Sequence, residues 1–180
     1  MSKKKIFILI IIVVLVVSYF IYWSKQNSLN NVNQITSFDV KNCTYIINNE
    51  NIALENGYAE KVLSTELATK SVVRYFGNQV AADFNNDGTN DEIFILTQDN
   101  GGSGTFYYAV GAINTSGGCF GTNTILLGDR IAPQTTELKD GMAVVNYADR
   151  AENEPMTSQP SIGVSRYFQI IDGKLLEVNK

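Results

Sequence analysis

The feature that most constrains this chain is an apolar block near its N-terminus. Seventeen of the eighteen residues from Ile6 to Trp23 are apolar, and Ser18 is the exception. As a helix rising roughly 1.5 Å per residue, this block would span about 27 Å, close to the hydrocarbon thickness of a bilayer. Lysines at residues 3–5 precede it, and positive charge is retained on the cytoplasmic side. The block predicts a single-pass transmembrane anchor over residues 6–23, with the basic tail 1–5 in the cytoplasm.

A cleaved signal peptide is the alternative interpretation of this block. Signal peptides have an apolar region of roughly 7 to 15 residues, followed by small residues at the cleavage site. Here the region is longer and ends in Tyr19-Phe20-Ile21-Tyr22-Trp23, which offers no such site. The first cysteine is Cys43, so no cysteine for lipid modification follows the block directly. These features favour an uncleaved anchor in the cytoplasmic membrane, followed by a polar linker over residues 24–38.

The rest of the chain has the composition of one acidic domain. Residues 26–180 carry 10 basic and 18 acidic residues, a net charge of −8. Such a domain disfavours nucleic acid as a partner, because nucleic acid requires clustered Lys and Arg. The chain contains no histidine, which excludes histidine-based catalytic triads and histidine-ligated zinc. We expect an extracytoplasmic domain over residues 39–180 that binds no nucleic acid.

Short apolar runs rich in β-branched and aromatic residues predict that this domain is all-β. Asn, Gly and Asp separate the runs, a spacing typical of a mostly antiparallel sandwich or barrel-like domain. Asn48-Asn49-Glu50 and Asp172-Gly173 predict hairpins. Gly77-Asn78 predicts a turn between two further strands. Residues 60–70 are the one segment expected to form a short helix, although their apolar spacing is thin.

The two cysteines, Cys43 and Cys119, both follow the predicted anchor. In an oxidising compartment, two cysteines pair more often than not. Two buried free thiols or one reactive thiol are the alternatives. A catalytic thiol is disfavoured because the chain has no histidine to activate it. We therefore predict a Cys43–Cys119 disulfide.

One loop has the ligand spacing of a calcium site. Its sequence, DFNNDGTND over residues 83–91, has oxygen-bearing side chains at positions 1, 3, 5 and 9 and glycine at position 6. Ca²⁺ takes six to eight oxygens, and alternate side chains around a tight turn can converge on one ion. The pattern therefore predicts a structural Ca²⁺ site. The predicted ligands are Asp83, Asn85, Asp87, the carbonyl of Thr89, and Asp91.

This calcium loop is not an EF-hand, because Phe94 stands where an EF-hand requires glutamate. Between two predicted strands, it is similar instead to the DxDxDGxxD loops of FG-GAP β-propeller blades. One loop cannot make a propeller, so the resemblance concerns the loop alone. The alternative is an Asx-rich hairpin whose side chains cap their own backbone without an ion. Repulsion between three neighbouring carboxylates favours the cation.

Carboxylates near other predicted strand ends are weaker candidates for chemistry. Asp129-Arg130 and Asp149-Arg150 lie in such positions, followed by Glu152 and Glu154. Paired carboxylates can catalyse glycoside hydrolysis, but only at a fixed separation that a sequence does not define. Exposed ion pairs are the alternative interpretation. The glycine-rich residues 100–104 lack the Lys-Ser/Thr ending of a phosphate-binding loop and predict a hairpin loop.

Several longer stretches resemble a family of small bacterial envelope β domains. They are YFGNQVAADFNNDGTNDEIFILTQDNGGSGTFYY (75–108), GTNTILLGDRIAPQTTE (121–137), VNYADR (145–150) and EPMTSQPSIGVSRYF (154–168). In that family the domain follows a signal, lipoprotein or membrane segment, and sometimes accompanies a META-type β domain. The resemblance implies an extracytoplasmic bacterial β domain with a DxNxDG loop. It implies no mechanism.

Together these patterns predict a membrane-anchored envelope protein whose β domain is a Ca²⁺-stabilised binding or structural module. Its expected partner, besides the membrane at residues 6–23, is an envelope protein or a glycan. A carboxylate-dependent hydrolase of the glycoside type is the alternative function. Inhibition of a cell-wall enzyme is a further alternative, which rests on the META association alone.

Overall fold

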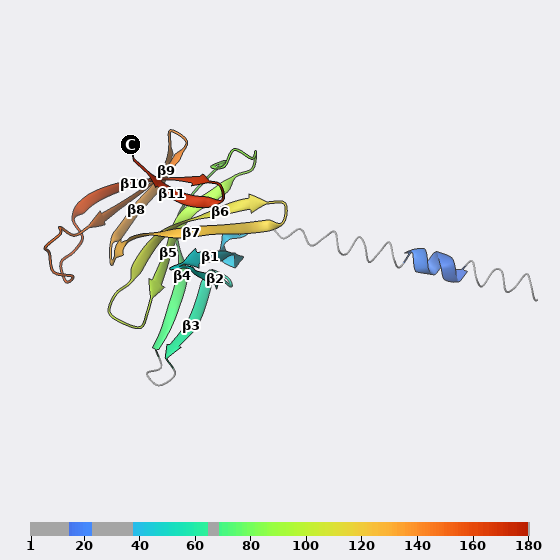
Figure 1. Cartoon of the computed structure of the whole chain (residues 1–180), viewed down its shortest axis with the longest axis horizontal. Helices are drawn as coiled ribbons and strands as arrows, with labels where there is room; N and C mark the ends of the chain where they lie inside the picture. The colour runs from blue at the N-terminus through green and yellow to red at the C-terminus, as the bar shows by residue number, and fades with distance from the viewer. Residues whose placement is uncertain (1–14, 23–37, 65–68, 180) are drawn as a thin grey trace, which may run out of the picture. The chain divides into compact units, whose positions relative to one another are not determined.

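A computed structural model describes residues 15–22, 38–64 and 69–179 (Figure 1). The chain divides into two compact units, Met1–Thr36 and Ser37–Lys180. In the first unit, residues 15–22 are helical. Among the described residues, no helix is both long and apolar enough to cross a bilayer. Much of the predicted anchor (6–23) and nearly all of the predicted linker (24–38) lie outside the described residues.

The second unit is built almost entirely of strands, which confirms the all-β prediction. It begins with a short 3-10 helix, η1 (Val40–Asn42). The strands are β1 Thr44–Ile47, β2 Glu50–Ala53, β3 Tyr58–Ser64, β4 Thr69–Ala82, β5 Asp91–Asp99, β6 Phe106–Thr115, β7 Gly118–Asp129, β8 Ala132–Lys139, β9 Met142–Asp149, β10 Ile162–Ile171 and β11 Lys174–Val178.

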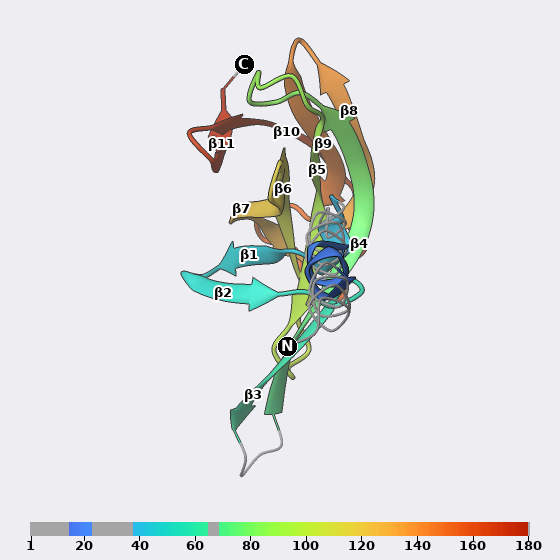
Figure 2. The same ribbon diagram turned by 90° about the vertical axis from the view of Figure 1, so that its right-hand side faces the viewer.

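The strands form two sheets, and we call the consecutive strands β4 to β7 of the larger sheet the wall. A seven-stranded sheet has the order β2-β1-β7-β6-β5-β4-β3, and a four-stranded sheet has the order β11-β10-β9-β8. In Figure 2, β8 to β11 lie in the upper part of the domain, and β1 and β2 lie lower, below β7. The named strand pairs are antiparallel except β1 with β7, which are parallel through Ile46 and Asn123. The unit is therefore a mostly antiparallel, barrel-like fold.

Strand β5 is the centre of that wall, because it is buried on both faces. Ile93 and Ile95 belong to the core beneath the four-stranded sheet. Phe94 and Leu96 point the opposite way, into a second core with residues of β1, β4 and β6. Successive side chains of a strand alternate between faces, so two cores require a continuous apolar run. This double burial explains why the sequence shows no polar alternation here.

Side-chain contacts of Asn123 and Arg166 help to join the four-stranded sheet to the wall at β7. The Asn123 amide donates to the backbone carbonyl of Leu175 and accepts from its backbone N–H, both at 3.1 Å. The Arg166 guanidinium donates to the Leu126 carbonyl at 2.6 Å and forms a two-point ion pair with Glu177. The guanidinium also lowers the pKa of the Glu177 carboxyl. In the described residues, side-chain contacts therefore join β7 to β10 and β11, where no continuous ladder of backbone hydrogen bonds connects the two sheets.

The two predicted hairpins are confirmed, and the turn residues of both have positive φ angles. Asn48 and Asn49 connect β1 to β2 with φ of 50° and 65°, and Asp172-Gly173 connects β10 to β11 with φ of 51° and 74°. Two consecutive positive φ angles define the turn whose twist matches that of a two-residue hairpin. Asn and Asp tolerate this conformation better than other non-glycine residues.

Two local predictions are wrong. Residues 60–64 lie in strand β3 and residue 69 begins β4, so no helix spans 60–70; residues 65–68 are outside the description. The pairing of Tyr58–Ser64 with β4 overrides a weak helical pattern. Gly77-Asn78 does not separate two strands either. Both residues lie within the continuous β4, where Gly77 (φ 107°) sits at an irregularity in the pairing with β5.

Candidate functional site

The predicted disulfide is present. Cys43 and Cys119 are bonded, with their Cα atoms 5.7 Å apart. The bond ties the start of β1 to the start of β7, across 76 residues of sequence. Gly121, two residues further along β7, lets β1 approach closely, because a Cβ there would lie 2.2 Å from the Thr44 carbonyl oxygen. The disulfide therefore stabilises the close contact between β1 and β7, which the missing side chain of Gly121 makes possible.

The predicted calcium loop connects β4 to β5, and its polar side chains bind the loop backbone. Asp83 accepts hydrogen bonds from the backbone N–H groups of Asp87 and Gly88, both at 3.0 Å. Asn85 accepts from the Asp87 N–H at 3.0 Å. Asp87 accepts from the Thr89 N–H at 2.8 Å and from its hydroxyl at 2.6 Å. These bonds are those of an Asx-rich hairpin, in which short side chains organise their own turn.

Asp91 anchors the end of this loop inside the protein. Its side chain is fully buried and accepts from the backbone N–H groups of Phe84 (3.2 Å) and Asn114 (3.0 Å). Burial raises the pKa of the Asp91 carboxyl, and the neighbouring charge of Asp87 raises it further. The carboxylate thus links the loop to β5 and to the end of β6.

The five predicted calcium ligands lie in one loop, and the side chains of four of them (Asp83, Asn85, Asp87 and Asp91) accept hydrogen bonds from protein donors. Within the described part of the chain, no three Asp, Glu, His or Cys side chains form a group arranged to hold a metal. An ionised carboxylate offers about four lone pairs, so the two or three hydrogen bonds that each loop carboxylate accepts leave accepting capacity. Gly88 has a φ of 89°, as expected for the backbone reversal of the loop. The calcium site remains a prediction.

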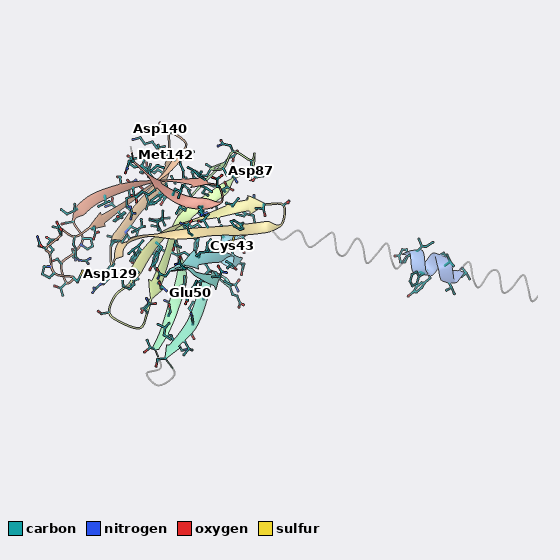
Figure 3. The ribbon with its side chains drawn as sticks, in the orientation of Figure 1. Cys43, Glu50, Asp87, Asp129, Asp140 and Met142 are labelled. Atoms are coloured by element: carbon teal, nitrogen blue, oxygen red, sulfur yellow. A yellow bond between two sulfur atoms is a disulfide. The ribbon has the colours of Figure 1, made fainter. Side chains whose placement is uncertain are left out.

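Of the carboxylates considered for hydrolysis, Asp129, Asp149 and Glu154 accept hydrogen bonds from backbone N–H groups. Asp129 binds its neighbour Arg130 and accepts from the Thr105 N–H at 2.9 Å. Arg150 donates to the carbonyls of Ser158 (2.6 Å) and Arg130 (3.0 Å), which fastens the 151–161 loop to the β7–β8 turn. Figure 3 shows Asp129 far from Asp87 across the β domain, so these carboxylates and those of the calcium loop do not form one site.

A second feature of the domain lies between the two edge strands of the seven-stranded sheet. β2 and β3 are the two edge strands of this sheet. Glu55, just after the end of β2, nevertheless forms an isolated bridge with Tyr58, the first residue of β3. From that bridge the two strands diverge (Figure 2). Two adjoining hollows of about 180 and 320 Å³ lie between them and share Ile52, Lys61 and Ser71. We call this region the β2–β3 slot.

The floor of the β2–β3 slot combines apolar side chains with a buried polar chain. Ile52, Ala59 and Val73 line the smaller hollow. At the larger hollow, the Tyr108 hydroxyl donates to the side-chain carbonyl oxygen of Gln98 at 3.1 Å, and the side-chain NH₂ of Gln98 donates to the Ser71 hydroxyl at 3.0 Å. The Ser71 hydroxyl donates in turn to Asn100 at 2.7 Å. Ser71 and Gln98 are 7% and 8% exposed, which makes this a fixed polar lining.

One exposed ion pair spans the slot. Lys61 of β3 lies 2.6 Å from the Glu50 carboxylate of β2, and both side chains are about half exposed. Pairs this exposed contribute roughly 0–1 kcal/mol, so a ligand could replace the contact at little cost. The sequence did not reveal the slot for two reasons. Residues 60–70 were expected to form a helix, so β3 was not predicted. Periodicity also does not show that two strands at opposite edges of a sheet lie on either side of one hollow.

Comparison with known proteins adds no assignment to this geometry. The chain matches no family model, no curated protein and no solved structure.

Proposed function

We propose that this chain is a membrane-anchored bacterial envelope protein whose β domain is an extracytoplasmic binding module. The observation that carries the binding function is the β2–β3 slot, a hollow with buried Ser71 and Gln98 in its floor. Ligand sites are concave and combine apolar lining with a few placed polar groups. The slot has this composition, and its partner is an envelope protein or a glycan.

The extracytoplasmic location rests on two features of the chain. The Cys43–Cys119 disulfide supports an oxidising compartment, because cytoplasmic thiols are kept reduced. The apolar block at 6–23, preceded by lysines, supports an anchor with the domain on the far side of the cytoplasmic membrane. The acidic balance of residues 26–180 fits a module that is not held on anionic surfaces.

We also propose a structural Ca²⁺ at Asp83, Asn85, Asp87, Thr89 and Asp91. The support is the ligand spacing together with electrostatics: burial raises the pKa of the Asp91 carboxyl, the charge of Asp87 adds to the rise, and a cation between them would relieve that repulsion. The ion would hold the β4–β5 loop and would take no part in catalysis. It would add to the hydrogen bonds that already organise the turn.

Calcium is expected to bind this loop and stabilise the domain. Millimolar CaCl₂ should give a calorimetric binding signal and raise the Tm, since a ligand at 100 times its Kd adds about 2.7 kcal/mol to the folded state. Chelator should reverse the rise. Asp87→Asn should abolish both effects, whereas the matched variant Asp99→Asn, outside the loop, should retain them. No heat and no shift in Tm with the unmodified chain would show that the loop is a plain turn.

The binding function is tested with intact peptidoglycan sacculi, which present both glycan strands and peptide stems. The full chain in detergent micelles should co-sediment with the sacculi and release no soluble reducing ends. Because the charged residues that line the slot are paired, Glu50 with Lys61 and Glu60 with Lys70, we expect retention to survive moderate salt. Release of reducing ends that Asp129→Asn or Asp149→Asn abolishes would instead establish the hydrolase. Absence of both retention and release would contradict the envelope-binding proposal.

A further inference from the structure

The backbone edge of β3 faces the slot. Tyr58 and Glu55 exchange backbone hydrogen bonds of 2.8 and 3.1 Å, so the Tyr58 backbone points toward β2. Hydrogen-bonding direction alternates along a strand, so Glu60 and Val62 point the same way, while Ala59 and Lys61 point toward β4. Within the described residues, β3 has no strand partner on this side. Its slot-facing N–H and C=O groups therefore form an open edge.

The edge of β2 forms the opposite wall. The Leu54 N–H donates to the Cys43 carbonyl at 2.9 Å, so Leu54 points toward the β1 side. By the same alternation, Ala53 and Asn51 direct their backbone groups away from β1 and into the slot. Both residues line the smaller hollow. Two strand edges whose backbone groups have no strand partner among the described residues thus face one hollow. Natural proteins usually cover such edges with another segment.

We propose that the β2–β3 slot binds an extended peptide segment of a partner protein, which adds as a strand to the open edge of β3. This assignment deepens the binding function proposed above and rests on it. Strand addition derives affinity from main-chain hydrogen bonds and specificity from pockets for alternate side chains. The slot supplies both parts, since the edges provide ladder positions and the two hollows receive alternate side chains.

The lining defines the chemistry of the peptide. Its inward side chains alternate between a small apolar group over Ile52, Ala59 and Val73 and an amide or hydroxyl group that meets Gln98 and Asn100. The opposite charges of the rims, Glu50 on β2 and Lys61 on β3, complement a basic and an acidic residue on its outward face. The described residues that line the two hollows include no aromatic ring, which favours a peptide over a stacked sugar.

The probe is a phage-displayed library of random 12-residue peptides, selected on the full chain in detergent micelles. Selected peptides, synthesised with a fluorescein label, should follow the apolar–polar alternation and bind in fluorescence anisotropy. Val62→Pro removes a slot-facing N–H without touching the β4 ladder, and should weaken binding about tenfold or more. If Val62→Pro loses the native circular dichroism spectrum, Ala53→Pro makes the corresponding change on the opposite wall.

The matched control is Leu138→Pro, on the edge strand of the other sheet. Lys139 pairs with Met142 across the Asp140-Gly141 turn, so Leu138 directs its backbone away from β9. Leu138 is half exposed and lies in the four-stranded sheet, whereas the slot lies between strands of the seven-stranded sheet. Peptide affinity should be unchanged in this variant. In the unmodified chain, bound peptide should slow hydrogen exchange at the amides of Glu60 and Val62.

The outcomes separate this proposal from the broader binding function. Peptides that bind the natively folded Val62→Pro or Ala53→Pro variant as tightly as the unmodified chain, or that leave exchange at Glu60 and Val62 unchanged, would overturn binding at the slot. Failure to select any peptide, with retention on sacculi intact, would overturn strand addition and leave a module that binds peptidoglycan in another way. Failure of both the peptides and the sacculi would overturn both proposals.

Discussion

Removing the Cys43–Cys119 disulfide is expected to lower the free energy of unfolding by about 4.5 kcal/mol, because the bond closes a loop across 76 residues. Reduction or the double substitution Cys43→Ala/Cys119→Ala should both have this effect. The reason is that the unfolded chain regains the conformational entropy that the cross-link denies it. Urea unfolding monitored by tyrosine fluorescence measures the change. A loss of this size is a large fraction of the 5–15 kcal/mol typical of a domain.

Two controls make this result specific. Reductant should leave the unfolding midpoint of the double-alanine variant unchanged, since that variant has no bond to break. Alkylation of free thiols in intact bacterial cells should leave Cys43 and Cys119 unmodified, because they are already paired if the domain is extracytoplasmic. An unchanged midpoint after reduction would contradict the stabilising role. Free thiols in cells would contradict the proposed location.

Phe94→Ala is expected to destabilise the domain by about 3–5 kcal/mol. Phe94 is fully buried in β5, where its ring contacts Tyr45 edge-on at 5.6 Å between centroids and Tyr75 at 5.1 Å. Truncation removes apolar area and two aromatic contacts, and leaves a cavity because β5 is held on both sides by neighbouring strands. The core affected is the one that includes Ile52 and Val73 beneath the slot.

Equilibrium urea unfolding with intact disulfide measures this change. Phe120→Ala is the matched control, because Phe120 is 53% exposed and its truncation should alter stability by at most about 0.5 kcal/mol. A loss below about 1 kcal/mol for Phe94→Ala would show that the second core is not closely packed around β5. The comparison separates burial from the mere removal of a phenyl ring.

The candidate site was only partly predictable, and the calcium loop illustrates why. Spacing alone brought Asp83, Asn85 and Asp87 into one turn, because alternate residues around a short reversal are neighbours. Spacing could not decide which atoms their oxygens meet. In the folded chain, Asp91 turns inward to the N–H of Asn114 on β6, a partner 23 residues away that loop periodicity does not reveal.

What the sequence by itself determined was local. Short apolar runs rich in β-branched and aromatic residues predicted strands. The paired turn residues Asn48-Asn49 and Asp172-Gly173 predicted hairpins, because few residues accept two positive φ angles in succession. The unbroken apolar run of β5 required burial on both faces.

The tertiary structure alone decided how these pieces meet. It made residues 60–64 a strand through their pairing with β4, and it kept β4 continuous through Gly77. It also placed the edges of β2 and β3 on either side of one slot. Each outcome depends on contacts between segments distant in sequence, whose free energy exceeds the weak local preferences that a sequence pattern records.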